Sequence, residues 1–159
     1  MGKIAARYGK PDAPLAGYAA LLATYGTLLV GFLGWRARTH ARSPSPGRLL
    51  LYAIATHKIA RILTRDQVAA PLRAPFVRVE RRAGRGEVVE RARGHGIRRA
   101  VGQLLTCPFC TGPWVAGTLL AGDAAAPQAT RFVASVFAVV TGADLLTRAS
   151  ARLDAGKAR

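Results

Sequence analysis

Acidic residues are scarce in this chain, which has eight Asp and Glu against 24 Lys and Arg and a formal net charge of +16. Half of its residues are nevertheless hydrophobic. So much charge of one sign in so apolar a chain requires the basic and the apolar residues to be segregated along the sequence, which is the pattern of membrane proteins. The length of 159 residues allows one domain.

Motifs of several functional classes are missing as well. The sequence has no zinc-finger spacing, no aromatic-rich strand motif of the RNA-binding type and no basic leucine-zipper heptads. We therefore expect no nucleic-acid partner, in spite of the positive charge. A serine nucleophile with a placed base, paired carboxylates and a glycine-rich phosphate loop are also absent, which argues against an enzyme of the common classes.

Long uncharged runs are present instead. Leu15 to Trp35 is 21 residues without a charge, and about 20 such residues are needed to cross roughly 30 Å of hydrocarbon. This run ends at Trp35 and an arginine rather than at small residues, so it is predicted to be a retained anchor and not a cleaved signal. Leu104 to Gly122 and Phe132 to Thr147 are two further apolar runs. The sequence predicts an all-α membrane protein with three or four transmembrane helices.

Whether there are three or four transmembrane helices depends on a shorter apolar run. Leu49 to Leu63 is 15 residues long and contains His57, Lys58 and Arg61. It either crosses the bilayer as a short span or lies in the interface as a basic amphipathic helix. Its three polar side chains either snorkel to the cytoplasmic surface, which we favour, or meet an intramembrane partner such as Asp144.

Two helical patterns predict contacts of the apolar runs. Asp144 and Arg148 are four residues apart, so we expect an ion pair on one helix face near the membrane edge. Small residues at helical spacing let a second helix approach closely. One such stripe in the first run is Ala19, Ala23, Thr27 and Gly31, and another in the last run is Ala134, Ala138 and Gly142.

The segments between the apolar runs are basic and rich in turn residues. In the longest, Phe76 to Glu80 and Glu87 to Arg91 flank Ala83-Gly84-Arg85-Gly86, which predicts a small β-hairpin. The expected organisation is a basic leader (1–13), a first transmembrane helix (14–35), a linker (36–48), a short transmembrane or interfacial helix (49–64), a basic cytoplasmic loop (65–103), a central transmembrane helix (104–122), a turn (123–131), a last transmembrane helix (132–148) and a basic tail (149–159).

The distribution of Lys and Arg predicts the orientation. If 49–63 crosses, the leader, the long loop and the tail share one side with 17 basic residues, against five on the other side. If 49–63 does not cross, the leader changes side. Both arrangements predict a multi-pass protein of the cell membrane with the long loop and the C-terminus in the cytoplasm. Anionic lipid head groups are expected to meet the basic loops.

Three segments carry a resemblance to a known family: Leu50 to Asp66 (LLYAIATHKIARILTRD), Ala70 to Phe76 (APLRAPF) and Leu104 to Ala116 (LLTCPFCTGPWVA). In this order they resemble the uncharacterised bacterial membrane family called domain of unknown function 1360, over roughly residues 49–148. The CPxCxxPW portion is the most specific part. The resemblance implies a polytopic bacterial membrane protein, with some relatives linked to sporulating bacteria, and it implies no activity.

Cys107 and Cys110 are the only cysteines, and they lie where the central run begins. Pro108 fits the first position of a helix, which would make Cys107 the N-cap and put Cys110 in the first turn. A helix N-terminus favours a thiolate, whereas apolar burial disfavours it. Pro113 follows at a spacing that predicts a kinked or broken start of the helix.

Several roles stay open for this pair. Both cysteines could pack a kinked helix in the reduced form, which is the interpretation we place first. Thiol–disulfide exchange is the second, because Cys-Pro-Phe-Cys resembles a glutaredoxin active site, although no β-α-β context surrounds it. Zinc is the third and needs four ligands. Cys107 and Cys110 have the spacing of one ligand pair, and His57 or His95 could complete a site within the chain, or a second subunit could supply another pair. Lipid attachment at a juxtamembrane cysteine comes last.

The leading functional hypothesis is therefore a small polytopic membrane protein with a structural or assembly role. Its expected partners are membrane lipids and other membrane protein subunits. The first alternative is a membrane-embedded dithiol redox protein whose catalytic residues are Cys107 and Cys110. The second alternative is a zinc-binding membrane protein, and no other cofactor is expected.

Overall fold

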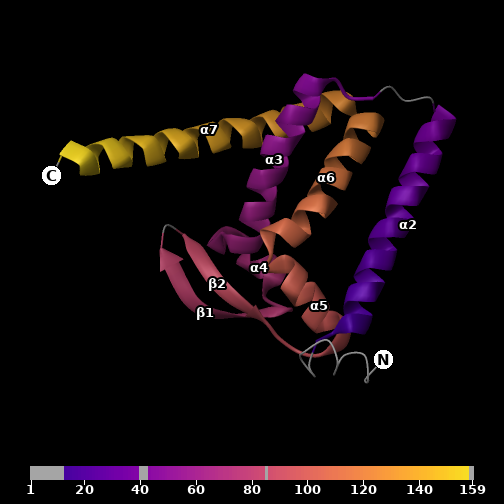
Figure 1. Cartoon of the computed structure of the whole chain (residues 1–159), viewed down its shortest axis with the longest axis horizontal. Coiled ribbons are helices and arrows are strands. Elements are labelled where there is room, and N and C mark those ends of the chain that lie inside the picture. The colour runs from indigo at the N-terminus through magenta and orange to yellow at the C-terminus, as the bar shows by residue number, and fades with distance from the viewer. Residues whose placement is uncertain (1–12, 40–42, 85, 158–159) are drawn as a thin grey trace.

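A computed structural model describes residues 13–39, 43–84 and 86–157, which form helices and one small sheet (Figure 1). The elements are α2 (Leu15–Thr39), α3 (Pro46–Arg65), the 3₁₀ turn η1 (Gln67–Ala69), α4 (Ala70–Arg73), β1 (Val77–Gly84), β2 (Glu87–Ala92), α5 (Gly96–Leu105), α6 (Pro108–Ala125) and α7 (Pro127–Lys157).

Three long helices lie side by side in Figure 1, and the hairpin lies at one of their two ends. α2 runs from the hairpin end to the opposite end, α3 returns, and α6 runs away from the hairpin again. The N-terminal end of α2 contacts α5, since the Tyr18 hydroxyl donates to Gln103 Oε1 at 2.5 Å. α7 begins beside the far end of α6, crosses α3 and extends away from the other helices.

A small core lies between α3, α6 and α7. Its contributors from α3 and α7 are mainly alanines, and Ala55 and Ala134 are completely buried, so the helices approach closely. The second predicted small-residue stripe therefore takes part in packing at Ala134, whereas all four residues of the first stripe are exposed. The buried core residues are Tyr52, Ala55, Ala60, Val115, Leu119 and Ala134.

Two helices are long and apolar enough to cross a membrane: α2, and α7 over Pro127–Asp154. α5 and α6 meet the same requirement only when they are taken together, and they are bent by 84° at the break between them. The described part of the chain thus holds two candidate spans, or three if the bent pair forms one. α3 is not among them, since Arg48, Lys58, Arg61 and Arg65 interrupt its apolar sequence.

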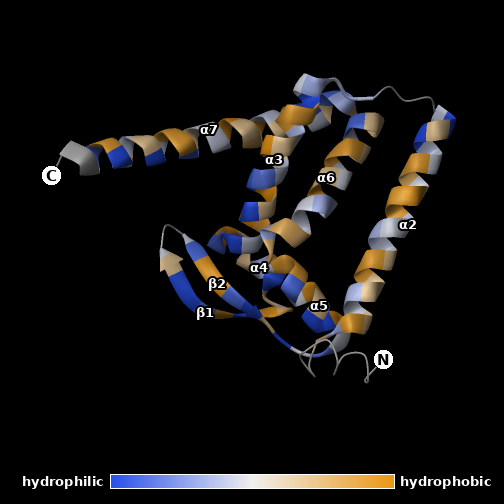
Figure 2. Ribbon diagram, in the orientation of Figure 1, coloured by the Kyte–Doolittle hydropathy of each residue, from blue (hydrophilic) through white to orange (hydrophobic). Residues whose placement is uncertain are grey.

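The apolar side chains of these helices largely point outwards. Leu22 and Val30 of α2 are 73% and 69% exposed, and Leu146 of α7 is 73% exposed. Figure 2 shows the hydrophobic colour running along both helices, while the hydrophilic colour gathers on the hairpin and the adjacent end of α3. Apolar surface of this extent marks a region that contacts lipid or other protein.

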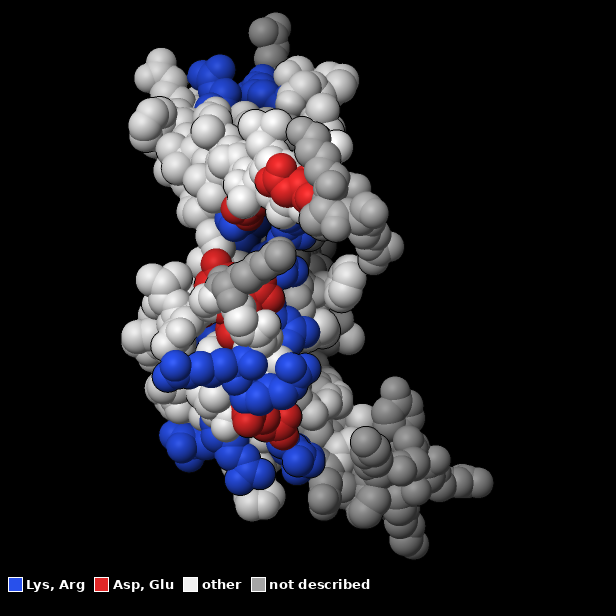
Figure 3. All heavy atoms as spheres, turned by 90° about the vertical axis from the view of Figure 1, so that its left-hand side faces the viewer, with Lys and Arg blue, Asp and Glu red and all other residues white. Residues whose placement is uncertain are grey.

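The predicted hairpin is confirmed. β1 pairs antiparallel with β2 in a register that runs from Val77↔Ala92 to Gly84↔Glu87. Gly84 adopts φ of 81°, a left-handed conformation that glycine tolerates at a tight turn. β1 exposes most of its side chains, and in Figure 3 basic side chains gather over this end of the molecule.

The hairpin is held against helices on two sides. On one side, Arg73 of α4 connects β2 with α3: its guanidinium forms an ion pair with Glu90 of β2, and its Nη1 donates to the carbonyl oxygens of Leu63 at 2.9 Å and of Asp66 at 3.1 Å at the C-terminus of α3. On the other side, α5 approaches so closely that a Cβ at Gly102 would lie 2.6 Å from the carbonyl oxygen of Phe76. The position of the hairpin relative to α3 and α5 is therefore fixed by direct contacts.

The helices differ from the predicted spans in two ways. α2 continues to Thr39 and α7 runs from Pro127 to Lys157, because backbone hydrogen bonding continues a helix through polar residues after the apolar run has ended. α5 occupies residues that we assigned to the loop. Ile97, Ala100, Val101 and Leu104 have the helical spacing that predicts it, and the basic residues between them obscured the pattern.

Candidate functional site

The site lies at the bend between α5 and α6. α5 ends with the Cys107 N–H donating to the Leu104 carbonyl at 3.2 Å, and the Thr111 hydroxyl donates to the same carbonyl at 2.8 Å. The run from Leu104 to Gly122 therefore has the broken start that was predicted: α5 ends at Leu105 and α6 starts anew at Pro108. Pro108 lacks a backbone N–H, and the first position of a helix needs none, so the sequence is compatible with a new helix starting here.

Cys107 is the N-cap of α6, which confirms the prediction from Pro108. Its Sγ accepts a hydrogen bond from the Cys110 N–H at 3.2 Å, and its carbonyl accepts the Thr111 N–H at 3.0 Å. The bond to Sγ satisfies the Cys110 N–H, which has no i→i−4 partner in the first turn, and the bond from Thr111 is the first regular hydrogen bond of α6. The first turn of α6 is thus organised around this cysteine.

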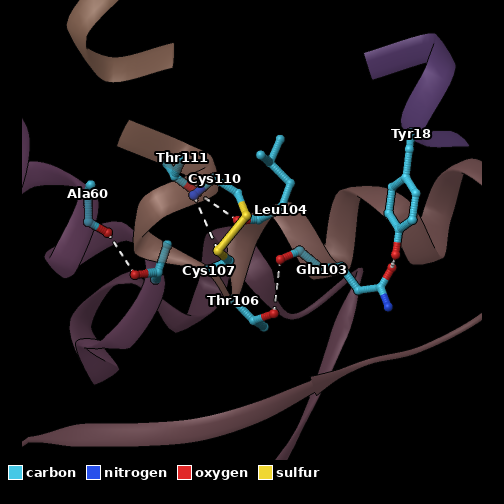
Figure 4. Close-up of a disulfide and its surroundings, with 9 residues drawn as sticks. Tyr18, Ala60, Gln103, Leu104, Thr106, Cys107, Cys110 and Thr111 are labelled. Carbon is cyan, nitrogen blue, oxygen red and sulfur yellow. Dashed lines mark hydrogen bonds between the residues drawn. A yellow bond between two sulfur atoms is a disulfide. The ribbon is translucent and has the colours of Figure 1, made fainter. Parts of the chain in front are cut away.

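Cys107 and Cys110 form a disulfide, with their Cα atoms 5.2 Å apart (Figure 4). Cys107 is half-buried, whereas Cys110 and its neighbour Phe109 are exposed, Phe109 to 92%. Packing of two reduced cysteines, the interpretation placed first from the sequence, therefore does not describe this pair. The pair is an accessible disulfide at a helix start.

A groove of about 830 Å³ runs between α3 and α6 beside the disulfide. Its walls are mostly apolar. α3 ends and α6 begins beside the hairpin, and this end of the groove is lined by Arg61, Arg65, Cys107 and Pro108. The opposite end is lined by Leu49 and Leu120. His57 also lines this groove, so the structure brings His57 and Cys107 to one cavity.

The predicted ion pair between Asp144 and Arg148 is wrong. Asp144 instead accepts a hydrogen bond from Lys58 Nζ at 2.6 Å, because α7 crosses α3 at this level. Arg61 forms an ion pair with Glu87 at the start of β2. Lys58 therefore meets Asp144, the partner named in the second alternative, whereas Arg61 pairs with the hairpin and His57 is exposed.

A further polar cluster, which the sequence did not predict, joins α3 to α6 at the end away from the hairpin. Asp123 is buried and accepts a hydrogen bond from the Tyr52 hydroxyl at 2.5 Å. Arg48 Nη1 lies 3.3 Å from both Asp123 oxygens. Asp123 directly follows an apolar run and was assigned to a turn, and nothing in the sequence identified its partners.

The proposed zinc ligands do not all converge. His57 shares the groove with Cys107, but His95 precedes α5 and does not line it. Among the residues that the structure describes, no group of three or more His, Cys, Asp or Glu is arranged to hold a metal ion. In the disulfide form the sulfurs also have no thiolate to donate.

Comparison with known proteins agrees with the resemblance seen in the sequence. Residues 51–150 match the family described as "Protein of unknown function (DUF1360)". The chain is also similar to the sporulation protein YjcA of Bacillus subtilis (strain 168), with 36% identity over 94 residues that cover 57% of this chain and 80% of that protein. No solved structure matches the chain. Since the family match covers more than half of the sequence, this chain belongs to the DUF1360 family of proteins of unknown function.

Proposed function

We propose that this protein is a multi-pass protein of the cell membrane in which α2, α3, α6 and α7 cross the bilayer. The opposite directions of α2 and α3 support this topology, as does the contact between the N-terminal end of α2 and α5. With the leader, the long loop and the tail on the side of the hairpin, 17 basic residues lie on that side and five on the other. The excess of Lys and Arg favours a cytoplasmic hairpin.

The packing of α3 supports its assignment as a crossing helix, although it is the least apolar of the four. It lies between α6 and α7 and contributes three of the buried core residues. Lys58 is paired with Asp144 of α7 within the bundle, whereas Arg61, nearer the C-terminus of α3, is paired with Glu87 of the hairpin on the proposed cytoplasmic side. Pairing within a bundle is how charged side chains are accommodated at membrane depth.

Labelling of single cysteines tests this topology in a Cys107→Ser/Cys110→Ser background. A membrane-impermeant maleimide should label Arg82→Cys on β1 only in inside-out vesicles. It should label Ser45→Cys, which precedes α3, only from the opposite side. Labelling of both positions from the same side would show that α3 does not cross.

We infer that the biochemical role is thiol–disulfide exchange at the bend. The observation that supports it is the exposed disulfide between Cys107 and Cys110 at the start of α6. At a cytoplasmic boundary, glutathione and thioredoxin keep thiols reduced, so disulfides found there are usually transient and belong to redox reactions. Figure 4 shows the disulfide in the first turn of α6, and of its two cysteines Cys110 is exposed and Cys107 half-buried.

The geometry supports a defined order of bond changes with a dithiol partner. A partner thiolate attacks the Sγ of the exposed Cys110, the S–S bond breaks, and the electron pair stays on the Sγ of Cys107. That thiolate accepts the Cys110 N–H and lies at the positive end of α6. The second partner thiolate then displaces Cys110, and the two partner protons pass to the two cysteines. The partner is oxidised and the protein is reduced.

Equilibration of the purified protein with reduced and oxidised glutathione, followed by alkylation, tests this role. We expect the pair to cycle reversibly near neutral pH. Cys107→Ser should hold a mixed disulfide with glutathione on Cys110, because the neighbouring thiolate that would displace it is gone. A pair that resists reduction, or a variant that forms no mixed disulfide, would leave the exchange reaction without support.

An assembly role is the second candidate, and a specific surface favours it. The small residues Ala19, Ala23, Thr27 and Gly31 lie close to one face of α2, and all four are exposed. Such a face allows close approach of another helix within a membrane. A Cβ at Gly31 would meet nothing within 4 Å, so Gly31→Leu should leave the protomer intact and weaken any oligomer. Light scattering of the protein in detergent measures the molar mass of the oligomer. An equal molar mass for Gly31→Leu and the parent would rule out assembly through this face of α2.

A further inference from the structure

The α3–α6 groove has the shape of a channel floored by small side chains. Two pairs of small residues line it at the four-residue spacing that keeps helical residues on one face: Thr56 and Ala60 of α3, and Gly112 and Ala116 of α6. From Leu49 to Arg65 it follows roughly 24 Å of helix at about 1.5 Å per residue. An extended, flexible apolar chain can occupy a channel of this form.

One end of the groove is positively charged. Arg61 and Arg65 line it there, and among the described residues that line the groove there is no carboxylate. Arg61 is paired with Glu87, whereas no carboxylate in the described residues forms an ion pair with Arg65. The first turn of α6 begins at the same end and adds the positive end of its backbone dipole.

We propose that the groove binds an anionic phospholipid. The head-group phosphate lies between Arg65, Arg61 and the start of α6, and one acyl chain follows Gly112 and Ala116 towards Leu49. The charge at one end and the apolar remainder match the two parts of this ligand, and the two arginines supply the charge-assisted hydrogen bonds that phosphate favours. The site goes beyond the exchange reaction and rests only on the proposed membrane location.

The position of this site connects the lipid with the disulfide. Cys107 lines the groove at its charged end, beside Pro108 and the exposed Phe109. A bound head group would therefore lie next to the sulfurs, and the acyl chain would cover the apolar wall of α6. A second copy of this chain or a helix of another protein would cover the same wall without needing a phosphate.

Native mass spectrometry of the detergent-purified full-length protein tests the proposal, with phosphatidylglycerol and phosphatidylcholine of identical acyl chains as probes. We expect phosphatidylglycerol to be retained preferentially. Arg65→Gln should lower that retention roughly fivefold, since a basic residue near a membrane surface contributes about 1 kcal/mol to anionic lipid binding. Arg78→Gln, on the exposed face of β1, is the matched control and should change nothing.

A second pair of variants tests the apolar part of the groove. A Cβ at Gly112 or at Gly142 would meet nothing within 4 Å, so both positions have room for a side chain to start. Gly112→Leu fills the channel and should abolish retention of both lipids, whereas Gly142→Leu on α7 should leave it unchanged.

Several results would overturn the proposal. Equal retention of the two lipids would show that the charged end does not select a head group. Retention that Gly112→Leu leaves intact would show that the lipid lies elsewhere. Displacement of the lipid by millimolar inorganic phosphate alone would assign the site to a free anion. A dimer that survives in detergent, excludes lipid and dissociates in Gly112→Leu would assign the groove to a second copy. None of these outcomes depends on whether Cys107 and Cys110 exchange disulfides.

Discussion

The guanidinium of Arg73 and the carboxylate of Glu90 form an ion pair that is shielded from solvent. Arg73 Nε lies 2.5 Å from Glu90 Oε2, and the two side chains are 1% and 2% exposed. Arg73 also donates to the carbonyls of Leu63 and Asp66, so one side chain connects the end of α3 with β2. Removing either member of such a pair leaves an uncompensated charge in a place that water does not reach.

We therefore predict that Arg73→Met destabilises the protein by about 3–5 kcal/mol, because Glu90 and two carbonyls of α3 lose their partner. Arg73→Met/Glu90→Met removes both charges and should recover part of this loss. Thermal unfolding of the detergent-solubilised protein, followed by resistance to protease, measures the effect. Arg78→Met on exposed β1 is the control. A single variant as stable as this control would mean that the pair is not buried in solution.

The contact between Lys58 and Asp144 leads to a charge-reversal prediction. Lys58→Asp or Asp144→Lys places like charges at the crossing of α3 and α7 and should destabilise the protein by about 1 kcal/mol, since Asp144 is partly exposed. The double exchange restores an opposite pair and should restore most of the stability. The alternative partner of Asp144, Arg148, is tested by Arg148→Asp, which should cost less stability than Lys58→Asp because only Lys58 donates a hydrogen bond to Asp144. A larger loss in Arg148→Asp than in Lys58→Asp would favour the pair within α7.

Several features of the fold follow from the sequence because they depend on residues close together in the chain. The hairpin needs only two strand-like runs and glycines at their turn, and the N-cap at Cys107 needs only Pro108 beside it. The length of their apolar runs likewise identifies α2 and α7 as candidate spans. In each case the physical cause acts over a few residues or one helix.

The polar contacts between helices could not be predicted in the same way. Asp123 pairs with Arg48 and Tyr52, and Lys58 pairs with Asp144, across separations set by how the helices pack. Local spacing suggested Arg148 for Asp144, since the two lie one turn apart, but the crossing of α3 and α7 supplies a different partner. The groove beside Cys107 also exists only once α3 and α6 are side by side.

Because α2 lies so close to α5, we predict that no side chain larger than that of glycine is tolerated at Gly17. A Cβ at this position would lie 2.6 Å from the Ala100 Cβ and 3.1 Å from the Gly96 carbonyl oxygen. Gly17→Val should therefore push α2 away from α5 and destabilise the protein by about 1–3 kcal/mol. Gly34→Val, at the other end of α2, meets nothing within 4 Å and is the matched control. Equal thermal midpoints for the two variants would show that α2 does not rest on α5.

The N-cap at Cys107 gives a prediction for the reduced protein. Its Sγ accepts the Cys110 N–H at 3.2 Å, and serine is a strong N-cap whose hydroxyl can accept the same bond. Under reducing conditions Cys107→Ser should therefore be at least as stable as the parent, whereas Cys107→Ala should lose about 1 kcal/mol because the first turn of α6 loses an acceptor. Thermal midpoints measured in excess reductant make the comparison, with Cys110→Ala as the control that keeps the cap. If Cys107→Ala and Cys107→Ser have the same midpoint, the sulfur is not capping α6, and the stabilisation of a Cys107 thiolate in the exchange reaction loses its structural basis.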